Sequence, residues 1–247
     1  PVMIGIGDIE AARERIAPYT RRTPTMALDQ LQQPVGTDAR VTLKLELLQV
    51  TGSFKARGAM NRLLGAPREE VEKGIVTASG GNHGLAVART AYAVGVPATI
   101  FVPETVSPSK VEKMQKWNAD VRIVGDVWGK SNDAALAFAR ESGAAYFHPF
   151  ADPLVVAGQG TLGLEILEQI PDMDVILVAI GGGGLISGLS TAIRARCLRK
   201  PCMSRSKRSM PSLRRRKRQQ FPIQRLQTIS TQSLQSMTPR MIQGNSN

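Results

Sequence analysis

Hydrophobic and polar residues follow two alternating patterns between residues 8 and 196. Apolar residues at helical spacing predict helices over residues 8–16, 53–64, 82–95, 107–118, 131–143, 155–170 and 185–196. Short apolar or alternating runs predict strands over residues 39–48, 74–79, 97–103, 120–125, 144–150 and 174–180. Strands that alternate with helices of this length indicate βαβ units, and therefore an α/β fold of parallel sheets flanked by helices on both faces.

Residues at the ends of these segments predict where the helices begin and end. Asp8, Ser53 and Ser107 are expected N-caps, because their side-chain oxygens can accept hydrogen bonds from the free N–H groups of a first helical turn. Gly95 and Gly143 are expected to end two of the helices, since glycine readily adopts the left-handed conformation found there.

Residues 197–247 show neither pattern. They hold 12 of the 32 Lys and Arg residues and none of the 20 Asp and Glu residues, so the formal net charge of +12 arises there while residues 1–196 are net neutral. This composition predicts a disordered tail. Because the pattern of a sheet-forming protein stops abruptly, we also expect the tail to be an out-of-frame translation that replaces the C-terminal part of a domain. Sequencing of the encoding DNA would test this.

Charge, cysteine content and hydropathy argue against nucleic-acid binding, cysteine-based sites and a membrane location. A basic tail can bind nucleic acid through phosphate contacts, but no aromatic residue interleaves the basic cluster, so we do not expect a nucleic-acid partner. Cys197 and Cys202 are the only cysteines and have no histidine nearby, so neither a metal site nor a disulfide framework is predicted. No apolar run reaches the roughly 18 residues of a membrane span, and no signal-peptide layout opens the chain. A soluble, cytoplasmic protein is expected.

The segment TGSFKARGA, residues 51–59, places Lys55 beside Phe54 and among small residues at the start of a predicted helix. Small neighbours let other groups approach closely. A lysine that is partly desolvated in such surroundings has a lowered pKa and can act as a nucleophile or base. The alternative is a solvated lysine on a helix surface, which is the commoner situation for this residue type.

The segment ASGGNHGLAVA, residues 78–88, joins the end of a predicted strand to the start of a predicted helix. Helix N-termini present unpaired N–H groups and the positive end of the helix dipole, which favour a carboxylate or a phosphate. The alternative is a tight turn in which Asn82 caps the helix and His83 lies on the surface.

The segment DVILVAIGGGGLISG, residues 174–188, runs from an apolar strand through four glycines into a helix. The backbone N–H groups of Gly181 to Gly184 can surround a phosphate, with the helix dipole behind them. The alternative is a flexible linker, but no polar spacer separates the strand from the helix. The glycine spacing is neither the Walker A pattern nor GxGxxG, so nucleotide binding has no specific support.

Together the three segments supply what pyridoxal 5′-phosphate needs: an amine for a Schiff base with its aldehyde, glycines for its phosphate, and a loop for an amino-acid carboxylate. GSFKARGA, SGGNHG and GGGGLISG, in this order and at these separations, resemble the fold-type II pyridoxal-phosphate enzymes. Within that group they resemble the threonine/serine dehydratase and serine racemase branch. The resemblance covers about residues 5–196.

The resemblance implies a two-domain, tryptophan synthase β-like fold and specific roles for residues. Residues 1–49 and 150–196 would belong to the larger domain, residues 50–149 to a small mobile domain, and residues 197–247 to the atypical tail. Lys55 would form the Schiff base, Phe54 would lie against the cofactor ring and Asn82 would bind its 3′-oxygen. The phosphate would be bound by Gly181, Gly182, Gly183, Gly184 and Leu185. The substrate carboxylate would be bound by Ser79, Gly80, Gly81 and His83.

The implied activity is the conversion of threonine or serine to a 2-oxo acid and ammonia by β-elimination, in a homodimer or homotetramer. In serine racemases a serine two residues before the loop asparagine is the second acid; here Gly80 holds that position and Ser79 lies one residue earlier. This difference favours elimination over racemisation, which remains the alternative. A cofactor-free relic is a third hypothesis. The late Ser or Cys that pairs with the ring nitrogen in this family has no counterpart in the tail, nor does its acidic metal site.

Overall fold

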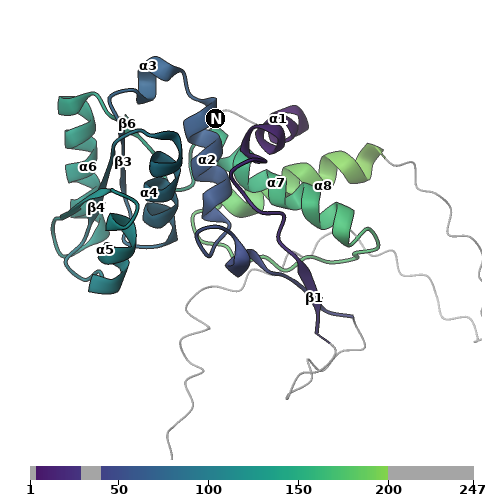
Figure 1. The fold of residues 1–247 in the computed structure, drawn as a ribbon. Coiled ribbons are helices and arrows are strands. Elements are labelled where there is room, and N and C mark those ends of the chain that lie inside the picture. The colour runs from purple at the N-terminus through teal and green to yellow at the C-terminus, as the bar shows by residue number, and fades with distance from the viewer. Residues whose placement is uncertain (1–3, 29–39, 200–247) are drawn as a thin grey trace, which may run out of the picture.

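The computed structural model describes residues 4–28 and 40–199. In chain order the elements are α1 (Ile6–Ile16), β1 (Thr25–Ala27), β2 (Thr42–Lys44), the 3-10 helix η1 (Glu46–Leu48), α2 (Lys55–Gly65), α3 (Arg68–Val71), β3 (Ile75–Ala78), α4 (Asn82–Val94), β4 (Ala98–Val102), α5 (Pro108–Gln115), β5 (Asp120–Ile123), α6 (Trp128–Ser142), β6 (Ala145–Tyr146), α7 (Pro153–Gln169) and α8 (Gly184–Arg199). Figure 1 shows a sheet with helices α4 to α6 beside a group formed by α1, α2, α7 and α8.

The main sheet has four parallel strands in the order β5-β4-β3-β6. The chain passes from β3 through α4 to β4 and through α5 to β5, and then returns through α6 to β6 on the other side of β3. Because parallel crossovers are right-handed, the reversal of direction puts α6 on the opposite face from α4 and α5. The expected α/β fold, with a parallel sheet covered on both faces, is confirmed.

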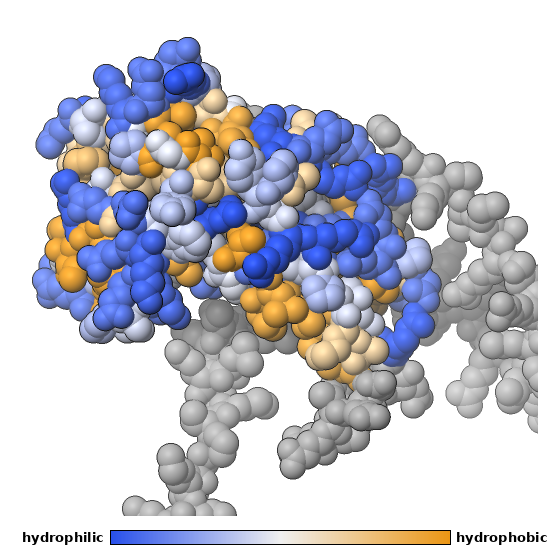
Figure 2. All heavy atoms as spheres, in the orientation of Figure 1, coloured by the Kyte–Doolittle hydropathy of each residue, from blue (hydrophilic) through white to orange (hydrophobic). Residues whose placement is uncertain are grey.

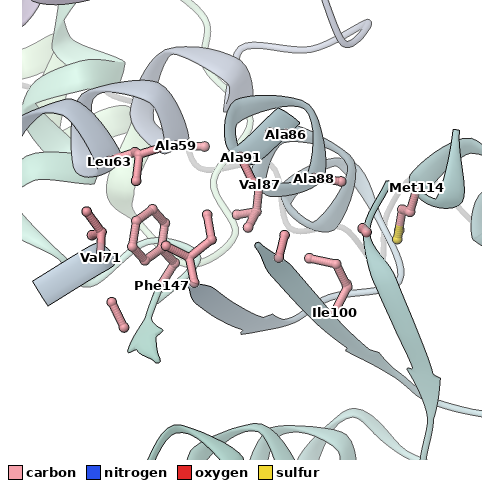
Figure 3. Close-up of a cluster of buried hydrophobic side chains, with 14 of the residues drawn as sticks. Ala59, Leu63, Val71, Ala86, Val87, Ala88, Ala91, Ile100, Met114 and Phe147 are labelled. Atoms are coloured by element: carbon pink, nitrogen blue, oxygen red, sulfur yellow. The ribbon is translucent and has the colours of Figure 1, made fainter. Parts of the chain in front are cut away.

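The two faces of the sheet carry separate hydrophobic clusters. Ile100 of β4 lies on the face covered by α4, where Figure 3 shows Val87 of α4, Leu63 of α2 and Phe147 close by. The next residue of the strand, Phe101, packs with residues of α6 on the other face. Every residue of β3 and β4 is buried, as expected for strands that are covered on both sides.

Helix α7 is the centre of the helical group and packs against α1, α2 and α8. Glycines allow these helices to approach closely, since a side chain would collide with the neighbouring backbone. A Cβ atom on Gly158 would lie 2.6 Å from the carbonyl oxygen of Arg57 in α2, and one on Gly188 would lie 2.5 Å from that of Val156 in α7. The backbone of α2, which begins at Lys55, is therefore held directly against α7.

The strand expected over residues 39–48 is present but much shorter than expected. The structure has a three-residue strand, β2, followed by η1, and β2 pairs antiparallel with β1, which the sequence pattern did not reveal. The chain turns where Glu46 leaves the strand, because its carboxylate accepts hydrogen bonds from the hydroxyl of Thr23 at 2.6 Å and from the guanidinium of Arg57. These side-chain bonds replace the backbone ladder of a longer strand.

The seven predicted helices are present, and two of their ends are confirmed. Gly95 and Gly143 follow α4 and α6 in the left-handed conformation, with φ angles of 79° and 76°. Two predicted N-caps are wrong. Helix α1 begins two residues before Asp8, whose carboxylate accepts the N–H of Gly5 at 2.7 Å from inside the first turn. The N-cap of α2 is Phe54 rather than Ser53.

The strand expected over residues 144–150 is shorter in the structure. Strand β6 has only two residues, and one further backbone hydrogen bond joins Phe147 N to Val76 O at 2.8 Å. The ladder cannot continue through Pro149, because proline has no N–H to donate. Residues 147–152 therefore leave the sheet as a loop.

The strand expected over residues 174–180 is also wrong, because this segment forms no ladder with any strand in residues 4–28 and 40–199. The burial still alternates: Ile176 and Val178 pack against the cluster of α7 and α8, whereas Val175 and Leu177 are 69% and 78% exposed. The apolar pattern thus gives the segment a buried side. A strand also needs a hydrogen-bonded neighbour, and the described part of the chain supplies none.

The surface in Figure 2 carries hydrophobic side chains in separate patches between hydrophilic ones. Within the described ranges, none of the helices has both the length and the apolar character that would be required to cross a bilayer. The expectations for the tail fall on residues 200–247, which lie outside the described residues; residues 197–199 continue the backbone of α8.

Candidate functional site

The carboxyl ends of β3 and β6 lie side by side where the chain changes direction across the sheet. The connection after β3 leads into α4, which covers one face of the sheet, whereas the connection after β6 leads into α7 of the helical group. In open α/β sheets such a switch point is the usual place for a ligand. Two segments leave the sheet here: residues 79–81, which lead into α4, and residues 147–152, which lead into α7.

The carbonyl oxygen of Phe147 ties these two segments together. It accepts a hydrogen bond from the hydroxyl of Thr77 in β3 at 2.7 Å, and Nε2 of His83 in α4 lies 3.2 Å from it. All three residues are buried. The start of the 147–152 loop is therefore fixed to both β3 and α4.

Lys55 reaches the same loop from the first turn of α2. Its Nζ atom donates a hydrogen bond to the carbonyl oxygen of Pro149 at 2.7 Å and lies 5.4 Å from the ring centroid of Phe54. Burial lowers the pKa of the Lys55 amine below its usual value. The structure thus agrees with the expectation of a partly desolvated lysine, and the alternative of a solvated surface cation is wrong.

The residues around Lys55 leave polar atoms free. The hydroxyl groups of Thr51 and Ser53 are buried and have no hydrogen-bond partner among the described residues. Phe54 packs against the hydrophobic cluster of Leu162 in α7 and Leu189 in α8. Because unpaired buried hydroxyl groups are uncommon, the turn before α2 has hydrogen-bonding capacity that a ligand could use.

The loop after β3 is tightly built. Ser79 donates its N–H to Phe101 O at 3.0 Å, and its hydroxyl accepts the N–H of Gly81 at 3.3 Å. A Cβ on Gly84 would lie 2.1 Å from the carbonyl oxygen of Ser79, and one on Gly80 would lie 2.9 Å from the side chain of Val106. This path of the loop therefore requires glycine at position 84, and a side chain at position 80 would have to displace Val106.

Asn82 and His83 occupy different environments. Asn82 is exposed and is the first residue of α4, whose N-cap is Gly81. His83 is buried, and burial together with the positive charge of Lys55 lowers the pKa of His83 to about 3. The alternative of a surface histidine is wrong. Its Nδ1 atom has no partner in the described structure, so one polar atom beneath the loop stays available.

The glycine loop, Gly181 to Gly184, packs on Phe150. A Cβ on Gly182 would lie 2.3 Å from the Phe150 ring, and one on Gly184 would lie 2.9 Å from the Phe150 carbonyl oxygen. Gly183 has a φ of 86°, and helix α8 begins at Gly184 with Leu185 next to it. The loop thus presents backbone N–H groups and a helix N-terminus, which suit an anion.

Pro149 and Phe150 are the residues that the sequence reading missed, because residues 144–150 were assigned to a strand. The carbonyl oxygen of Pro149 accepts a hydrogen bond from Lys55, and Phe150 contacts the glycine loop. These two adjacent residues therefore bring residues 51–59 and the glycine loop together. The available signal was the proline, which ends a strand, together with the position of the pair at the carboxyl end of a parallel strand.

A buried ion-pair network, which the sequence pattern did not reveal, holds the helix that carries Lys55. Arg57, two residues further along α2, is buried and pairs with Glu46 at 2.8 Å and with Glu165 of α7 at 2.7 Å. Lys44 of β2 also pairs with Glu165 at 2.7 Å. Hydrogen bonding to both carboxylates outweighs the effect of burial and raises the pKa of Arg57. This network joins the lysine helix to β2, η1 and α7.

The arrangement can perform a limited set of reactions. A partly buried amine can bond a carbonyl carbon, and it can remove a proton once it is free. The glycine loop can hold an anionic group near that amine, and the loop after β3 can hold a second anion. The geometry therefore suits a carbonyl compound with an anionic group, acting on a substrate that also carries a carboxylate.

Residues 16–236 match the protein family described as pyridoxal-phosphate dependent enzyme. The sequence is 45% identical over 186 residues to the L-threonine ammonia-lyase of Geobacter sulfurreducens, which covers 75% of this chain and 46% of that protein. The chain spans about half the length of the curated relatives it matches.

Two solved structures are similar to the fold. A maize serine racemase is 38% identical with a TM-score of 0.75, over 79% of this chain and 59% of that one. A threonine deaminase from T.th. is 43% identical with a TM-score of 0.70, over 78% of this chain and 62% of that one.

Proposed function

Because the chain belongs to the family of pyridoxal-phosphate dependent enzymes, we propose that it eliminates water from a β-hydroxy amino acid, threonine or serine. Hydrolysis of the product takes up one water and releases a 2-oxo acid and ammonia. The observation that carries the proposal is the meeting of the Lys55 amine and the glycine loop on the turn formed by Pro149 and Phe150. The similarity to proteins named L-threonine ammonia-lyase and threonine deaminase supports this class of reaction.

The residues at this turn fit pyridoxal 5′-phosphate. Lys55 would hold the aldehyde, since an amine whose pKa is lowered by burial is more often uncharged and therefore nucleophilic. Gly182 and Gly184 lie so close to Phe150 that the loop can offer only backbone to a phosphate. The phosphate would be bound by Gly181, Gly182, Gly183, Gly184 and the N–H of Leu185.

The remaining site residues would orient the ring and the substrate. Phe54 is assigned to the face of the cofactor ring and Asn82 to its 3′-oxygen. Ser79, Gly80, Gly81 and His83 are assigned to the loop that holds the substrate carboxylate. His83 would support this loop from beneath, because its Nε2 atom already lies within hydrogen-bonding distance of Phe147 O.

The bound cofactor supplies an electron sink that acidifies the Cα–H bond of an amino acid. The Nζ atom of Lys55 accepts the Cα proton, because a lowered pKa leaves more of this amine unprotonated near neutral pH. The burial of Lys55 beside Phe54 and Pro149 keeps bulk water away from this atom. The loop over residues 79–83 holds the carboxylate and so fixes which face of Cα is presented.

Gly80 separates this reaction from the second candidate, racemisation, which the similarity to a serine racemase favours. Racemisation needs an acid on the side of Cα opposite Lys55. The position of that acid in serine racemases is Gly80 here, and a Cβ on it would lie 2.9 Å from Val106. Since no side chain can stand there without displacing Val106, we favour elimination.

The proposal also covers assembly and motion. Residues 50–149 would form a small domain that closes over the substrate against residues 1–49 and 150–196, and the whole protein would act as a homodimer or homotetramer. Closure would exclude water from the site.

The test is incubation of the chain with pyridoxal phosphate and a panel of β-hydroxy amino acids, while ammonia, 2-oxo acid and cofactor absorbance are followed. We expect ammonia and 2-oxo acid in equal amounts from L-threonine or L-serine, and their loss in Lys55→Ala. Formation of the D-amino acid without ammonia would support racemisation instead. A cooperatively folded chain that fails to bind the cofactor would overturn the proposal and support a relic.

A further inference from the structure

His148 makes an unusual pair of hydrogen bonds in the loop that receives Lys55. Its Nδ1 atom accepts the backbone N–H of Phe150 at 3.2 Å and that of Ala151 at 2.9 Å. Pro149, between His148 and Phe150, has no N–H. The imidazole therefore closes the turn in the way that an Asn or Asp side chain closes a turn on its own backbone.

This geometry fixes the protonation state of the ring. Two N–H groups point at Nδ1, so this atom must carry a lone pair and the single proton of the neutral ring must be on Nε2. A proton on Nδ1 would face two donors and would have no acceptor. The turn is therefore compatible only with the neutral Nε2–H tautomer of His148.

The turn closed by His148 contains both contacts that define the candidate site. The carbonyl of Pro149 accepts the Lys55 amine at 2.7 Å. The ring of Phe150, on which the glycine loop packs, meets the His148 ring edge-on with centroids 4.6 Å apart. If the turn opened, the Pro149 carbonyl that accepts the Lys55 hydrogen bond and the Phe150 ring that contacts the glycine loop would both be displaced.

Charged and titratable groups from four elements lie near His148. Lys55 faces it from α2, Asp152 from the start of α7 and His83 from α4, while the Tyr146 ring lies 6.2 Å away in β6. Burial lowers the pKa of His148, the Asp152 carboxylate acts in the opposite direction, and the charge of Lys55 lowers it further. The neutral ring that the turn requires is thus the form favoured near neutral pH.

We propose that His148 is a positioning residue: its unprotonated Nδ1 atom closes the Pro149–Phe150 turn and so holds the lysine acceptor and the glycine loop in place, and its protonation opens the turn. The part that concerns cofactor capture rests on the proposed function. Above the pKa of His148 the turn is intact. As the pH falls through that pKa, Nδ1 becomes a donor, the two N–H groups lose their acceptor, and the affinity for pyridoxal phosphate falls.

The first experiment needs no cofactor. The chain has two histidines, so long-range ¹H–¹⁵N spectra of the imidazoles, assigned with the variant His83→Gln, report the tautomer of His148 directly. We expect an unprotonated Nδ1 and a protonated Nε2 at neutral pH. A protonated Nδ1 at neutral pH would overturn the proposal, whether or not the chain binds pyridoxal phosphate. A failure of the proposed function is thus distinguishable from a failure of this inference.

The second experiment compares two variants by cofactor titration across pH. His148→Leu removes the acceptor, and we expect its dissociation constant for pyridoxal phosphate to rise about tenfold or more, since two N–H groups lose their partner. His148→Asn keeps an acceptor that does not titrate, so we expect its dissociation constant for pyridoxal phosphate to stay within about threefold of that of the parent chain. We also expect this constant to rise less steeply as the pH is lowered.

Circular dichroism and thermal unfolding show whether each variant is folded, and the reactivity of the Lys55 amine toward an acylating reagent gives a readout independent of the cofactor. We expect this reactivity to change in His148→Leu and to be retained in His148→Asn. Equal behaviour of a folded His148→Leu and the parent chain in both measurements would overturn the positioning role. The role would also be overturned if His148→Asn lost affinity for pyridoxal phosphate at low pH as steeply as the parent chain does.

Discussion

The amine of Lys55 and the carbonyl oxygen of Pro149 lie 2.7 Å apart, although 94 residues separate them in the chain. The contact exists because β6 pairs with β3 and ends after two residues, which turns the following loop toward the start of α2. The sheet topology, rather than local sequence, therefore creates the surroundings of this amine.

The variant Lys55→Ala should fail to develop the visible absorbance of a lysine-bound cofactor, because it lacks the amine that would bond the aldehyde. Titration with pyridoxal phosphate and absorbance spectroscopy would measure this. Lys110→Ala is the matched control, since Lys110 is an exposed lysine of α5. Retention of the full band in a folded Lys55→Ala would refute the assignment of this lysine.

The variant Gly182→Ala should weaken cofactor binding, because its methyl group would lie 2.3 Å from the Phe150 ring. Overpacking of this kind costs about 1–3 kcal/mol, which corresponds to roughly a 5- to 150-fold loss of affinity if the cost falls on the cofactor-binding conformation. Gly181→Ala should cause a smaller loss, since a Cβ there meets no described atom within 4 Å. Adding Phe150→Ala to Gly182→Ala should relieve part of the collision. Equal losses in the two glycine variants would contradict this explanation.

The variant Arg57→Met should lower the free energy of unfolding by about 3–5 kcal/mol. Glu46 would remain largely buried without an ion-pair partner, and Glu165 would keep only Lys44. Urea denaturation measures the change. Arg13→Met is the control: its ion pair with Glu168 is about half exposed, so we expect a loss under about 1 kcal/mol. If both variants lost the same amount, the buried network would contribute no more than a surface pair.

His83 should make the fold sensitive to acid. Its pKa falls from 6.5 in the unfolded chain to about 3 in the folded one, so the unfolded state binds the proton more strongly. The contribution of His83 to stability is therefore complete above pH 6.5, declines by about 1.4 kcal/mol per pH unit below it, and levels off near pH 3. In His83→Gln, urea midpoints measured between pH 7 and pH 4 should fall less steeply. An unchanged slope would assign the acid sensitivity to other groups.

Local patterns predicted much of this structure. Helical spacing identified the long helices, and glycines marked the ends of α4 and α6, because these features depend on neighbours in the sequence. The three segments that carry Lys55, Asn82 and Gly181 also indicated the family, which the match over residues 16–236 confirms. Their assigned roles at the site stay predictions.

Features that depend on distant contacts could not be read from periodicity. Residues 174–180 have the apolar alternation of a strand but form no ladder within the described part of the chain, because a strand requires a neighbour as well as a pattern. The ion pairs of Arg57 and the turn closed by His148 likewise join residues that only the folded chain brings together. Single charged residues in a sequence do not reveal such partners.

The close contact of α2 with α7 at Gly158 has a consequence for variation in this protein. A Cβ on Gly58 would also lie 2.8 Å from the carbonyl oxygen of Val155 and 2.4 Å from the side chain of Gln159, so this position of α2 has no room for a side chain either. The position of α2, and of Lys55 in its first turn, thus depends on this close packing against α7. Substitutions in the nearby hydrophobic clusters can therefore change the stability of the protein while changing the position of the Lys55 amine very little.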